Sequence, residues 1–392
     1  MGRQWAVPSQ TTASRYLVDI EGAICTCADY ELRKGTCKHQ HAVYYWIAWG
    51  RDVSADGTVT ETITVKRQTY KQEDWSAYRE SQRHEKEYVK RLARDLCVRI
   101  PQPARKPGRG RNRRLRSDLA YEAIMKGYTN LSGSRLISDL NECFDDGYIV
   151  KVGHENSIHN FLASDETTPL LISLIEQAFI PLGAIENGQY AIDSTGMSPC
   201  IFDRYYSIRH EGVVARKQYL KLHIMAGVST HGIATAKVTT ASEQDSPQLV
   251  ELLTRTRKGN DVRELSADKG YSKISHHALL EELGIAAFIR FKDDAVIHAD
   301  PDAWSRNLAE FLLRRNQWLP RYHRRSNVET VFSMLKGKFG ASIRAKRPRS
   351  QINEVLVKCL AHNLCCYVKA IFMSGLAPTV WTDAKPLLTV VP

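Results

Sequence analysis

Several common features are missing from this 392-residue chain. It has no run of 18 apolar residues, which a membrane-spanning helix would need. It also lacks a signal peptide and a lipidation motif, and no internal repeat is evident. Its nine cysteines are an odd number, and a disulfide framework is not expected. These absences predict a cytoplasmic protein with no membrane partner. The length of the chain is sufficient for two or three domains.

Acidic residues are missing from two stretches that are rich in lysine and arginine. Residues 101–116 contain seven Lys or Arg, three Pro and two Gly but no acid, which predicts a flexible basic linker. From Arg314 to Arg349 there are eleven Lys or Arg, and Glu329 is the only acid. The whole chain carries a formal net charge of +12. Positive charge clustered in this way predicts a polyanionic partner, and nucleic acid is the best candidate.

The sequence around Glu329 has the periodicity of a helix. Within residues 321–340, four side chains lie at offsets of three, four and seven and share one stripe, beside a stripe of apolar residues: Tyr322, Arg325, Glu329 and Lys336. A lone carboxylate in cationic surroundings suits a metal ligand placed where a polyanion binds. Glu329 also fits a capping box that begins at Ser326, and taken alone the two interpretations have equal weight.

Two aspartates provide further carboxylates. Asp193 ends a strand expected from residue 189, and Asp268 ends a strand expected from residue 262. An aspartate at the end of a strand is often only a turn residue or a helix cap. Three such positions in one domain are harder to dismiss as turn residues, and they are suitable places for the ligands of a metal site. No His or Cys cluster lies near the two aspartates, which argues against zinc at this site.

The expected elements follow one another in the order β-β-β-α-β-α-β-α. Three strands precede the first helix, and the second and third are joined by a tight turn, which makes them antiparallel. The pattern predicts an α/β fold with a mixed five-stranded sheet flanked by helices. The expected strands are 189–193, 219–229, 232–240, 262–268 and 286–291, and the expected helices are 246–257, 272–283 and 321–340.

This order, with carboxylates after the first and fourth strands and on the last helix, resembles the ribonuclease-H-like fold of DDE transposases. The pattern Tyr322-x2-Arg325-x3-Glu329-x6-Lys336 matches the signature of a large class of prokaryotic insertion-sequence transposases. The resemblance covers roughly residues 117–372. It implies a catalytic triad of Asp193, Asp268 and Glu329 that holds two Mg²⁺ or Mn²⁺ ions. It also implies supporting contacts to DNA or the triad from Tyr322, Arg325, Lys336, Arg324 and Lys338.

The implied activity is metal-dependent cleavage of double-stranded DNA at the ends of an insertion sequence, followed by strand transfer into target DNA. A dimer or higher oligomer on DNA, associated with the nucleoid, is expected. Two alternatives remain open: a non-catalytic DNA-binding protein derived from a transposase, and a metal-dependent nuclease without strand transfer. The presence of all three carboxylates favours the enzyme over the binding protein.

A second group of candidate ligands lies near the N-terminus. Cys25-x-Cys27 and Cys37-x-His39 are separated by nine residues and provide the four soft ligands of a closed structural Zn²⁺ site. This spacing resembles the SWIM zinc-binding domain, which is thought to bind DNA or protein. His41 is an alternative to His39.

The expected domains are therefore a SWIM-type zinc-binding domain (1–66), a charged helix and basic linker (67–116), a helical region (117–188) and a ribonuclease-H-like catalytic domain (189–392). Residues 72–97 are expected to form a solvated helix. The helical region either contacts DNA or supports the sheet, and support is favoured. The apolar helix at 351–373 is expected to pack on the sheet.

Overall fold

The structure, a computed structural model, divides into two compact units near residue 72, and each is described by itself. The described residues are 4–8, 15–48, 52–53, 59–60, 74–102, 114–199, 219–292, 294–298 and 302–377. Most of the basic linker expected at 101–116 lies outside these residues, as does the junction between the first two expected domains.

The first unit is a small antiparallel sheet with two helices. Strand β2 (Arg15–Asp19) pairs with β1 (Gln4–Pro8) and with β3 (Ile24–Cys25), and α1 (Ala28–Arg33) and α2 (Lys38–Ala48) follow. Two short strands, β4 (Asp52–Val53) and β5 (Val59–Thr60), form a separate pair. The buried core consists of Val18, Val43 and three cysteines. So small a core needs an additional source of stability, such as a bound metal.

The second unit is built on a mixed sheet with the strand order β10-β9-β6-β7-β8. Strands β6 (Gln189–Pro199), β7 (Leu220–Gly227) and β8 (Ile233–Thr240) are antiparallel neighbours. On the other side of β6, β9 (Glu264–Ala267) and β10 (Ala286–Ile289) run parallel to it. The expected mixed sheet is thus confirmed. A sixth strand, β11 (Ser342–Ile343), pairs with the end of β6 and was not foreseen, because two residues leave no periodic pattern.

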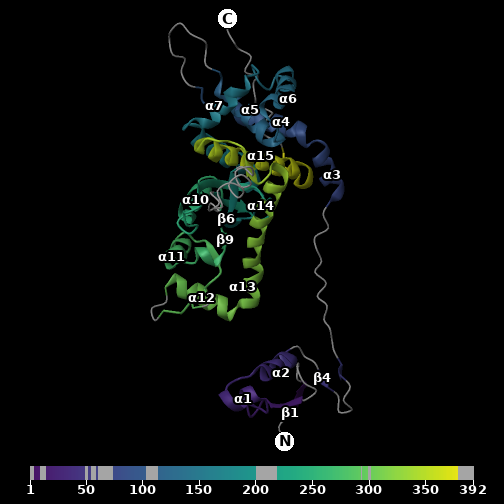
Figure 1. Ribbon diagram of the computed structural model, residues 1–392, viewed down its shortest axis with the longest axis vertical. Coiled ribbons are helices and arrows are strands. Elements are labelled where there is room, and N and C mark those ends of the chain that lie inside the picture. The colour runs from purple at the N-terminus through teal and green to yellow at the C-terminus, as the bar shows by residue number, and fades with distance from the viewer. Residues whose placement is uncertain are drawn as a thin grey trace, which may run out of the picture. The chain divides into compact units, whose positions relative to one another are not determined.

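Helices cover both faces of this sheet, as Figure 1 shows. α10 (Gln248–Thr256) and α11 (Ile274–Glu282) lie on one side, and α14 (Ser326–Phe339) crosses the other. α8 (Thr167–Gly183) and α15 (Pro348–Ser374) pack against β8. The helices expected at 246–257 and 272–283 are therefore confirmed to within a few residues.

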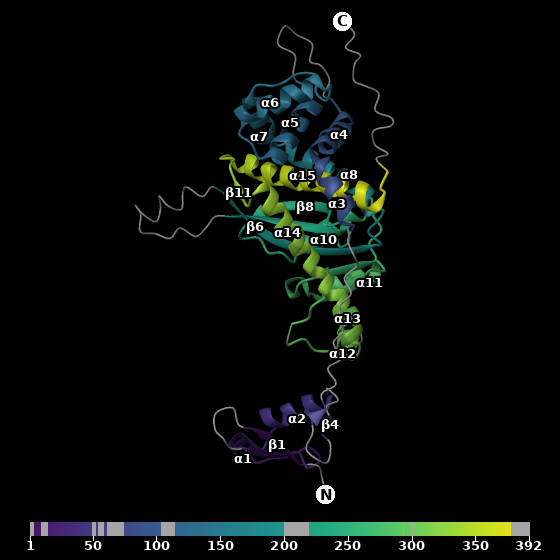
Figure 2. The same ribbon diagram turned by 90° about the vertical axis from the view of Figure 1, so that its right-hand side faces the viewer.

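A helical layer precedes the sheet in the chain and lies on the far side of α15 from it (Figure 2). It contains α4 (Glu85–Val98), α5 (Arg116–Thr129), α6 (Gly133–Asp145) and α7 (Glu155–Ala163), and α3 (Trp75–Arg83) packs on α15 beside it. The expectation of a solvated helix at 72–97 is wrong for α4, whose Val89, Ala93 and Cys97 are fully buried. Their spacing of four residues gives α4 an apolar face, which α5 and α15 cover.

Among the described residues, α15 is the one helix that is long and apolar enough to cross a membrane, although most of it is buried within the second unit. Its neighbours are α5 and α7 on one side and α8 and β8 on the other. This burial is what a central helix of a layered domain requires, and it explains the apolar composition without a membrane.

The helix expected at 321–340 is interrupted. α13 (Arg315–Tyr322) is followed by the 3₁₀ turn η2 (His323–Arg325), and α14 begins at Ser326. A 3₁₀ turn rotates by about 120° per residue instead of about 100°, so three residues shift the helical stripe by about 60°. Tyr322 therefore leaves the stripe that Arg325, Glu329 and Lys336 share. α12 (Ala303–Leu313) was not foreseen.

Candidate active site and metal centre

The parallel pairing of β6 and β9 places two aspartates side by side. Ile192 lies opposite Ala267, so Asp193 and Asp268 are the next residues on neighbouring strands, which are about 4.8 Å apart. Asp268 follows the end of β9 and accepts a hydrogen bond from its own neighbour, Lys269 N (2.7 Å). Asp193 does not end its strand as expected. β7 pairs with β6 beyond this position, and only the ladder to β9 stops here.

Arg325 joins Glu329 to the first of these aspartates. Its guanidinium donates to Asp193 Oδ2 (3.0 Å) and to Glu329 Oε1 (2.7 Å). The alternative capping box is not formed, because Ser326 Oγ donates to His323 O (2.9 Å) and no side chain caps α14. The structure therefore directs Glu329 toward the sheet carboxylates.

The electrostatics of the site show that the carboxylates interact. Burial raises the pKa of Asp193, and the negative charges of Asp268 and Glu329 raise it further, whereas the Ser194 N–H and Arg325 lower it. Burial alone would lower the pKa of Arg325, but its hydrogen bond and ion pair with Glu329 and the charge of Asp193 raise it. One guanidinium only partly compensates three carboxylates, and such a site favours additional cations.

Two other residues of the expected stripe lie in different surroundings. Lys336 Nζ donates to Thr195 Oγ1 (2.6 Å), and Thr195 lies two residues beyond Asp193 on the same face of β6. Burial lowers the pKa of Lys336. Tyr322 is only 8% exposed, and its ring stacks on Trp318 with the centroids 5.3 Å apart. Tyr322 thus belongs to an aromatic cluster below the site.

Arg324 and Lys338, which the sequence assigned to DNA contact, have internal partners. Arg324 forms an ion pair with Glu264 (2.9 Å), at the start of β9. Lys338 Nζ lies 2.5 Å from both carboxylate oxygens of Glu85, on α4. These pairs anchor both ends of α14 to the rest of the unit.

Sequence reasoning missed a polar network on the opposite face of β6. Ser194 Oγ donates to Asp245 Oδ1 (2.9 Å), which also lies 3.0 Å from Lys221 Nζ and 3.5 Å from His223 Nδ1. Asp245 stands in a polar loop before α10, where no pattern distinguishes it from an ordinary turn residue.

Tyr271 ends the 3₁₀ turn η1 (Lys269–Tyr271), which follows Asp268. It is 1% exposed, and its hydroxyl has no hydrogen-bond partner among the described residues. Burial raises its pKa, and the charges of Asp193, Asp245 and Asp268 add to this effect. The phenol therefore lies within the field of the carboxylates.

The first unit brings together the four predicted zinc ligands: Cys25, Cys27, Cys37 and His39 are all buried, and their ligand atoms lie within 4.8 Å of one another. Sγ of Cys25 and Sγ of Cys37 are each 3.9 Å from Nδ1 of His39. Ligand atoms around tetrahedral zinc are about 3.5–3.8 Å apart, given Zn–S bonds of about 2.3 Å and Zn–N bonds of about 2.0–2.1 Å. The residues therefore fit one zinc ion with only small adjustments. His41, the alternative, is exposed.

Local structure places these four ligands. Cys25 ends β3, and Cys27 caps α1 by accepting from Tyr30 N (3.4 Å). Cys37 lies just before α2, and its N–H donates to Gln40 Oε1 (2.8 Å). Burial raises the pKa of Cys25 to about 12. Burial raises the pKa of Cys37, but hydrogen bonds from the backbone N–H groups of Gln40 and His39 and from the neighbouring thiols outweigh burial and lower it.

Comparison with known proteins agrees with this geometry. Residues 187–364 match the family described as Transposase DDE domain. The matched stretch starts just before β6 and ends within α15, so it contains all three carboxylates. The match supports a transposase role for this chain.

Among solved structures, the chain is similar to a piggyBac transposase in a cryo-EM synaptic complex with hairpin DNA. The identity is 12% and the TM-score 0.34, with 76% of this chain and 77% of that chain covered. At this TM-score the similarity indicates nothing about function, whereas the family match and the geometry of the site do.

Proposed function

We propose that this protein is a DDE transposase that cleaves DNA at the ends of an insertion sequence and joins those ends to target DNA. The observation that carries the proposal is the placement of Asp193 and Asp268 side by side on parallel strands, with Glu329 linked to Asp193 through Arg325. The strand order and directions also agree with a ribonuclease-H-like fold. All three carboxylates lie within the matched family stretch.

The three carboxylates are suitable ligands for Mg²⁺ or Mn²⁺, which bind oxygen. When bound, two such ions activate the attacking oxygen and stabilise the leaving oxygen of a phosphodiester. The chain's own residues supply the framework: β6 and β9 fix the aspartates, and α14 carries Glu329. Arg325 holds Asp193 and Glu329 together in the free protein, and its guanidinium becomes available to a DNA phosphate once cations neutralise the carboxylates.

The first unit has a separate role in this proposal. Cys25, Cys27, Cys37 and His39 hold one structural Zn²⁺, and this SWIM-type domain contributes to recognition of the element ends. Double-stranded DNA is the partner of both units, and the protein works as a dimer or higher oligomer on that DNA.

The decisive experiment measures cleavage and joining of a plasmid that carries the coding region with its flanking DNA. Asp193→Asn, Asp268→Asn and Glu329→Gln should each reduce cleavage by about a thousandfold, equal to about 4 kcal/mol of transition-state stabilisation. Asp261→Asn is the matched control, because Asp261 is exposed and, within the described part of the chain, its one ion pair is with Arg263. Excess EDTA should abolish cleavage by the wild type.

Each outcome distinguishes the alternatives. Cleavage without joined products identifies a nuclease. Binding without cleavage in either Mg²⁺ or Mn²⁺ identifies a non-catalytic DNA-binding protein. A variant that still cuts at the wild-type rate removes its residue from the triad.

A further inference from the structure

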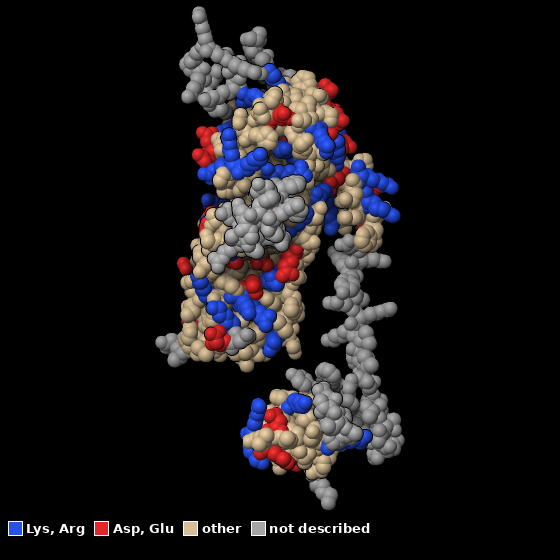
Figure 3. Space-filling view, viewed as in Figure 1, with Lys and Arg blue, Asp and Glu red and all other residues tan. Residues whose placement is uncertain are grey.

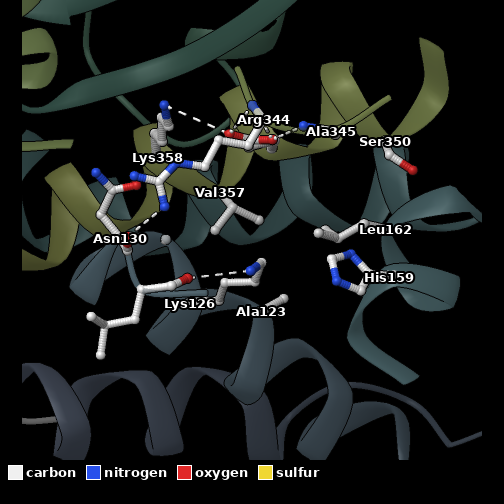
Figure 4. Close-up of a pocket in the computed structure, with 13 residues that line it drawn as sticks. Ala123, Lys126, Asn130, His159, Leu162, Arg344, Ala345, Ser350, Val357 and Lys358 are labelled. Atoms are coloured by element: carbon white, nitrogen blue, oxygen red, sulfur yellow. Dashed lines mark hydrogen bonds and ion pairs between the residues drawn. The ribbon is translucent and has the colours of Figure 1, made fainter. Parts of the chain in front are cut away.

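A cavity of about 90 Å³ lies in the second unit, between α5, α7 and the start of α15 (Figure 4). Part of its lining is apolar and comes from Ala123, Leu162 and Val357. α5 and α15 approach each other closely here, at Gly127 and Val357. Three cationic side chains, each from a different element, also line the cavity: Lys126 of α5, Arg344 of the segment after β11, and Lys358 of α15.

Most of the hydrogen-bond donors in this cavity are unused. Lys126 Nζ donates to Leu131 O (3.3 Å), and Arg344 donates through one guanidinium nitrogen to Asn130 O (2.8 Å). A lysine ammonium has three donors and a guanidinium has five. Among the described residues, no other partner is present for these two side chains, so several N–H groups can still bind an acceptor.

Glu354, the one carboxylate among the residues that line the cavity, only partly offsets these cations. Both oxygens of Glu354 accept backbone N–H groups, from Arg344 (3.0 and 3.1 Å) and Ala345 (2.8 Å). Its oxygen lies 3.8 Å from Lys358 Nζ, which donates instead to Gly340 O and Ser342 O. Burial lowers the pKa of both lysines, the negative charge of Glu354 raises it, and the positive charge of Arg344 lowers it. A bound anion would relieve this excess of positive charge.

The beginning of α15 adds to the same preference. Its first turn contains no acid, and no side chain caps it. Ser350, in this turn, lines the cavity and is only 8% exposed. Its side-chain hydroxyl has no hydrogen-bond partner among the described residues. Free N–H groups at the start of a helix favour negative charge, and a serine hydroxyl donates readily to a phosphate oxygen.

We infer that this cavity binds a phosphate of the DNA backbone at a position outside the active site. The inference rests on the proposed function for the identity of the polyanion. Lys346 and Arg347, both exposed, extend the positive charge beside the cavity. On the face shown in Figure 3, lysine and arginine side chains form a band across the upper part of the second unit.

The cavity is also fixed relative to the carboxylates. Ser342 of β11 pairs with Ser198 of β6, five residues beyond Asp193, and Arg344 follows two residues later. Five residues of strand span about 17 Å, which equals about five base-pair steps of DNA. A phosphate held here therefore positions the duplex several base pairs from the bond that is cut.

The test uses the full chain and a fluorescent duplex of about 30 base pairs, with affinity measured against salt concentration. Lys126→Met keeps the aliphatic stem but removes the charge, and it should weaken binding about tenfold and reduce the salt slope by about 0.9. Lys258→Met is the matched control, because Lys258 is exposed on a loop after α10, and its affinity and slope should be unchanged. Cleavage at saturating DNA should proceed at the wild-type rate in both variants.

Ser350→Asp distinguishes binding from folding. A carboxylate in the first turn of α15 suits the helix, so the melting temperature should be retained or rise, yet the same charge repels a phosphate and should weaken duplex binding by tenfold or more. Equal affinities for the wild type, Lys126→Met and Ser350→Asp would overturn the inference. DNA would also be excluded as the source of the phosphate if inorganic phosphate raised the melting temperature of the wild type but not of Lys126→Met, while the two proteins bound the duplex with the same affinity. If the wild type binds duplex through Lys126 but never cleaves it, the proposed function fails and this site stands.

Discussion

The two candidate metal sites of this protein are assembled in opposite ways. The four soft ligands of the first unit come from a stretch of 15 residues, are all buried, and already lie within 4.8 Å of one another. The three carboxylates come from two strands and a distant helix, and Asp193 and Glu329 are joined by the guanidinium of Arg325. Among the described residues, only the first group is gathered closely enough to surround an ion with small adjustments.

This difference separates a structural site from a reactive one. A closed set of four ligands leaves no position for a substrate, so its metal contributes to folding. The carboxylate site is open, its negative charge is only partly balanced, and Arg325 joins two of its carboxylates. The four predictions below test this contrast, from the largest effect to the smallest.

Replacing His39 with Gln should unfold the first unit and leave the second intact. The binding free energy of a structural zinc is about 10–16 kcal/mol, and a core of five small residues does not compensate its loss. Zinc content, measured by mass spectrometry, should fall from about one ion per chain to none, and calorimetry should lose one of two transitions. His41→Gln is the matched control and should retain both zinc and fold. Equal zinc content in the two variants would contradict the assignment.

Replacing Arg325 with Met should tighten binding of Mn²⁺ to the carboxylate site about tenfold. A positive charge 3.0 Å from Asp193 and 2.7 Å from Glu329 competes with a cation for the same oxygens. Calorimetric titration of the protein without DNA measures this effect. Arg324→Met, one residue earlier, removes a charge that pairs with Glu264 instead and should change Mn²⁺ affinity much less. Weaker binding by Arg325→Met would mean that the arginine organises the ligands more than it competes.

Replacing Asp193 with Asn should stabilise the second unit at neutral pH in the presence of EDTA. The pKa of Asp193 is raised, so its ionised form is less favourable in the folded than in the unfolded protein. The neutral aspartate therefore gives greater stability at low pH, and this stability is lost as pH rises through the raised pKa. Melting temperatures should favour the variant at pH 7–8, and the difference should disappear below the ordinary aspartate pKa. A variant that melts lower at every pH would show that the link to Arg325 outweighs burial and repulsion.

Replacing Lys338 with Met should lower the stability of the second unit by about 1–2 kcal/mol, because it leaves the largely buried Glu85 unpaired. The loss of stability is moderate because solvent screens the Lys338 side chain, which is 38% exposed. A double-mutant cycle with Glu85→Gln measures the coupling directly. If Lys338 is an anchor, the salt dependence of DNA binding should not change. A slope reduced by about 0.9 would restore the DNA contact that the sequence suggested.

Local patterns allowed much of the fold to be predicted. The alternation and turns at 219–240 located β7 and β8, and the order of elements gave the mixed sheet. The spacing of Cys25, Cys27, Cys37 and His39 was sufficient to predict that these side chains lie together, because all four are close in sequence. Local sequence patterns did not predict the features that depend on tertiary contacts. Burial of α4 depends on α5 and α15, and the length of β6 beyond Asp193 depends on β7 and β11.

The same limit applies to the candidate site. The sequence pointed to Asp193, Asp268 and Glu329 as candidates, but the bridge from Arg325 to Asp193 joins positions 132 residues apart, and no local pattern encodes it. Asp245 is recognisable only once Ser194 and His223 are known to face it across a strand pair. The 3₁₀ turn that removes Tyr322 from the stripe has no signature in residue spacing.

The alternation of β6 makes the site vulnerable to a change in chain length rather than in chemistry. Asp193 faces α14, and Ser194 faces Asp245 on the other side of the same strand. Inserting one residue before Ile192 would turn each of these side chains to the opposite face. Ile192 would then take the position of Asp193 and face α14, and the carboxylate would face Asp245, which would place two like charges together. All three carboxylates would still be present in the chain, yet they would no longer share one site.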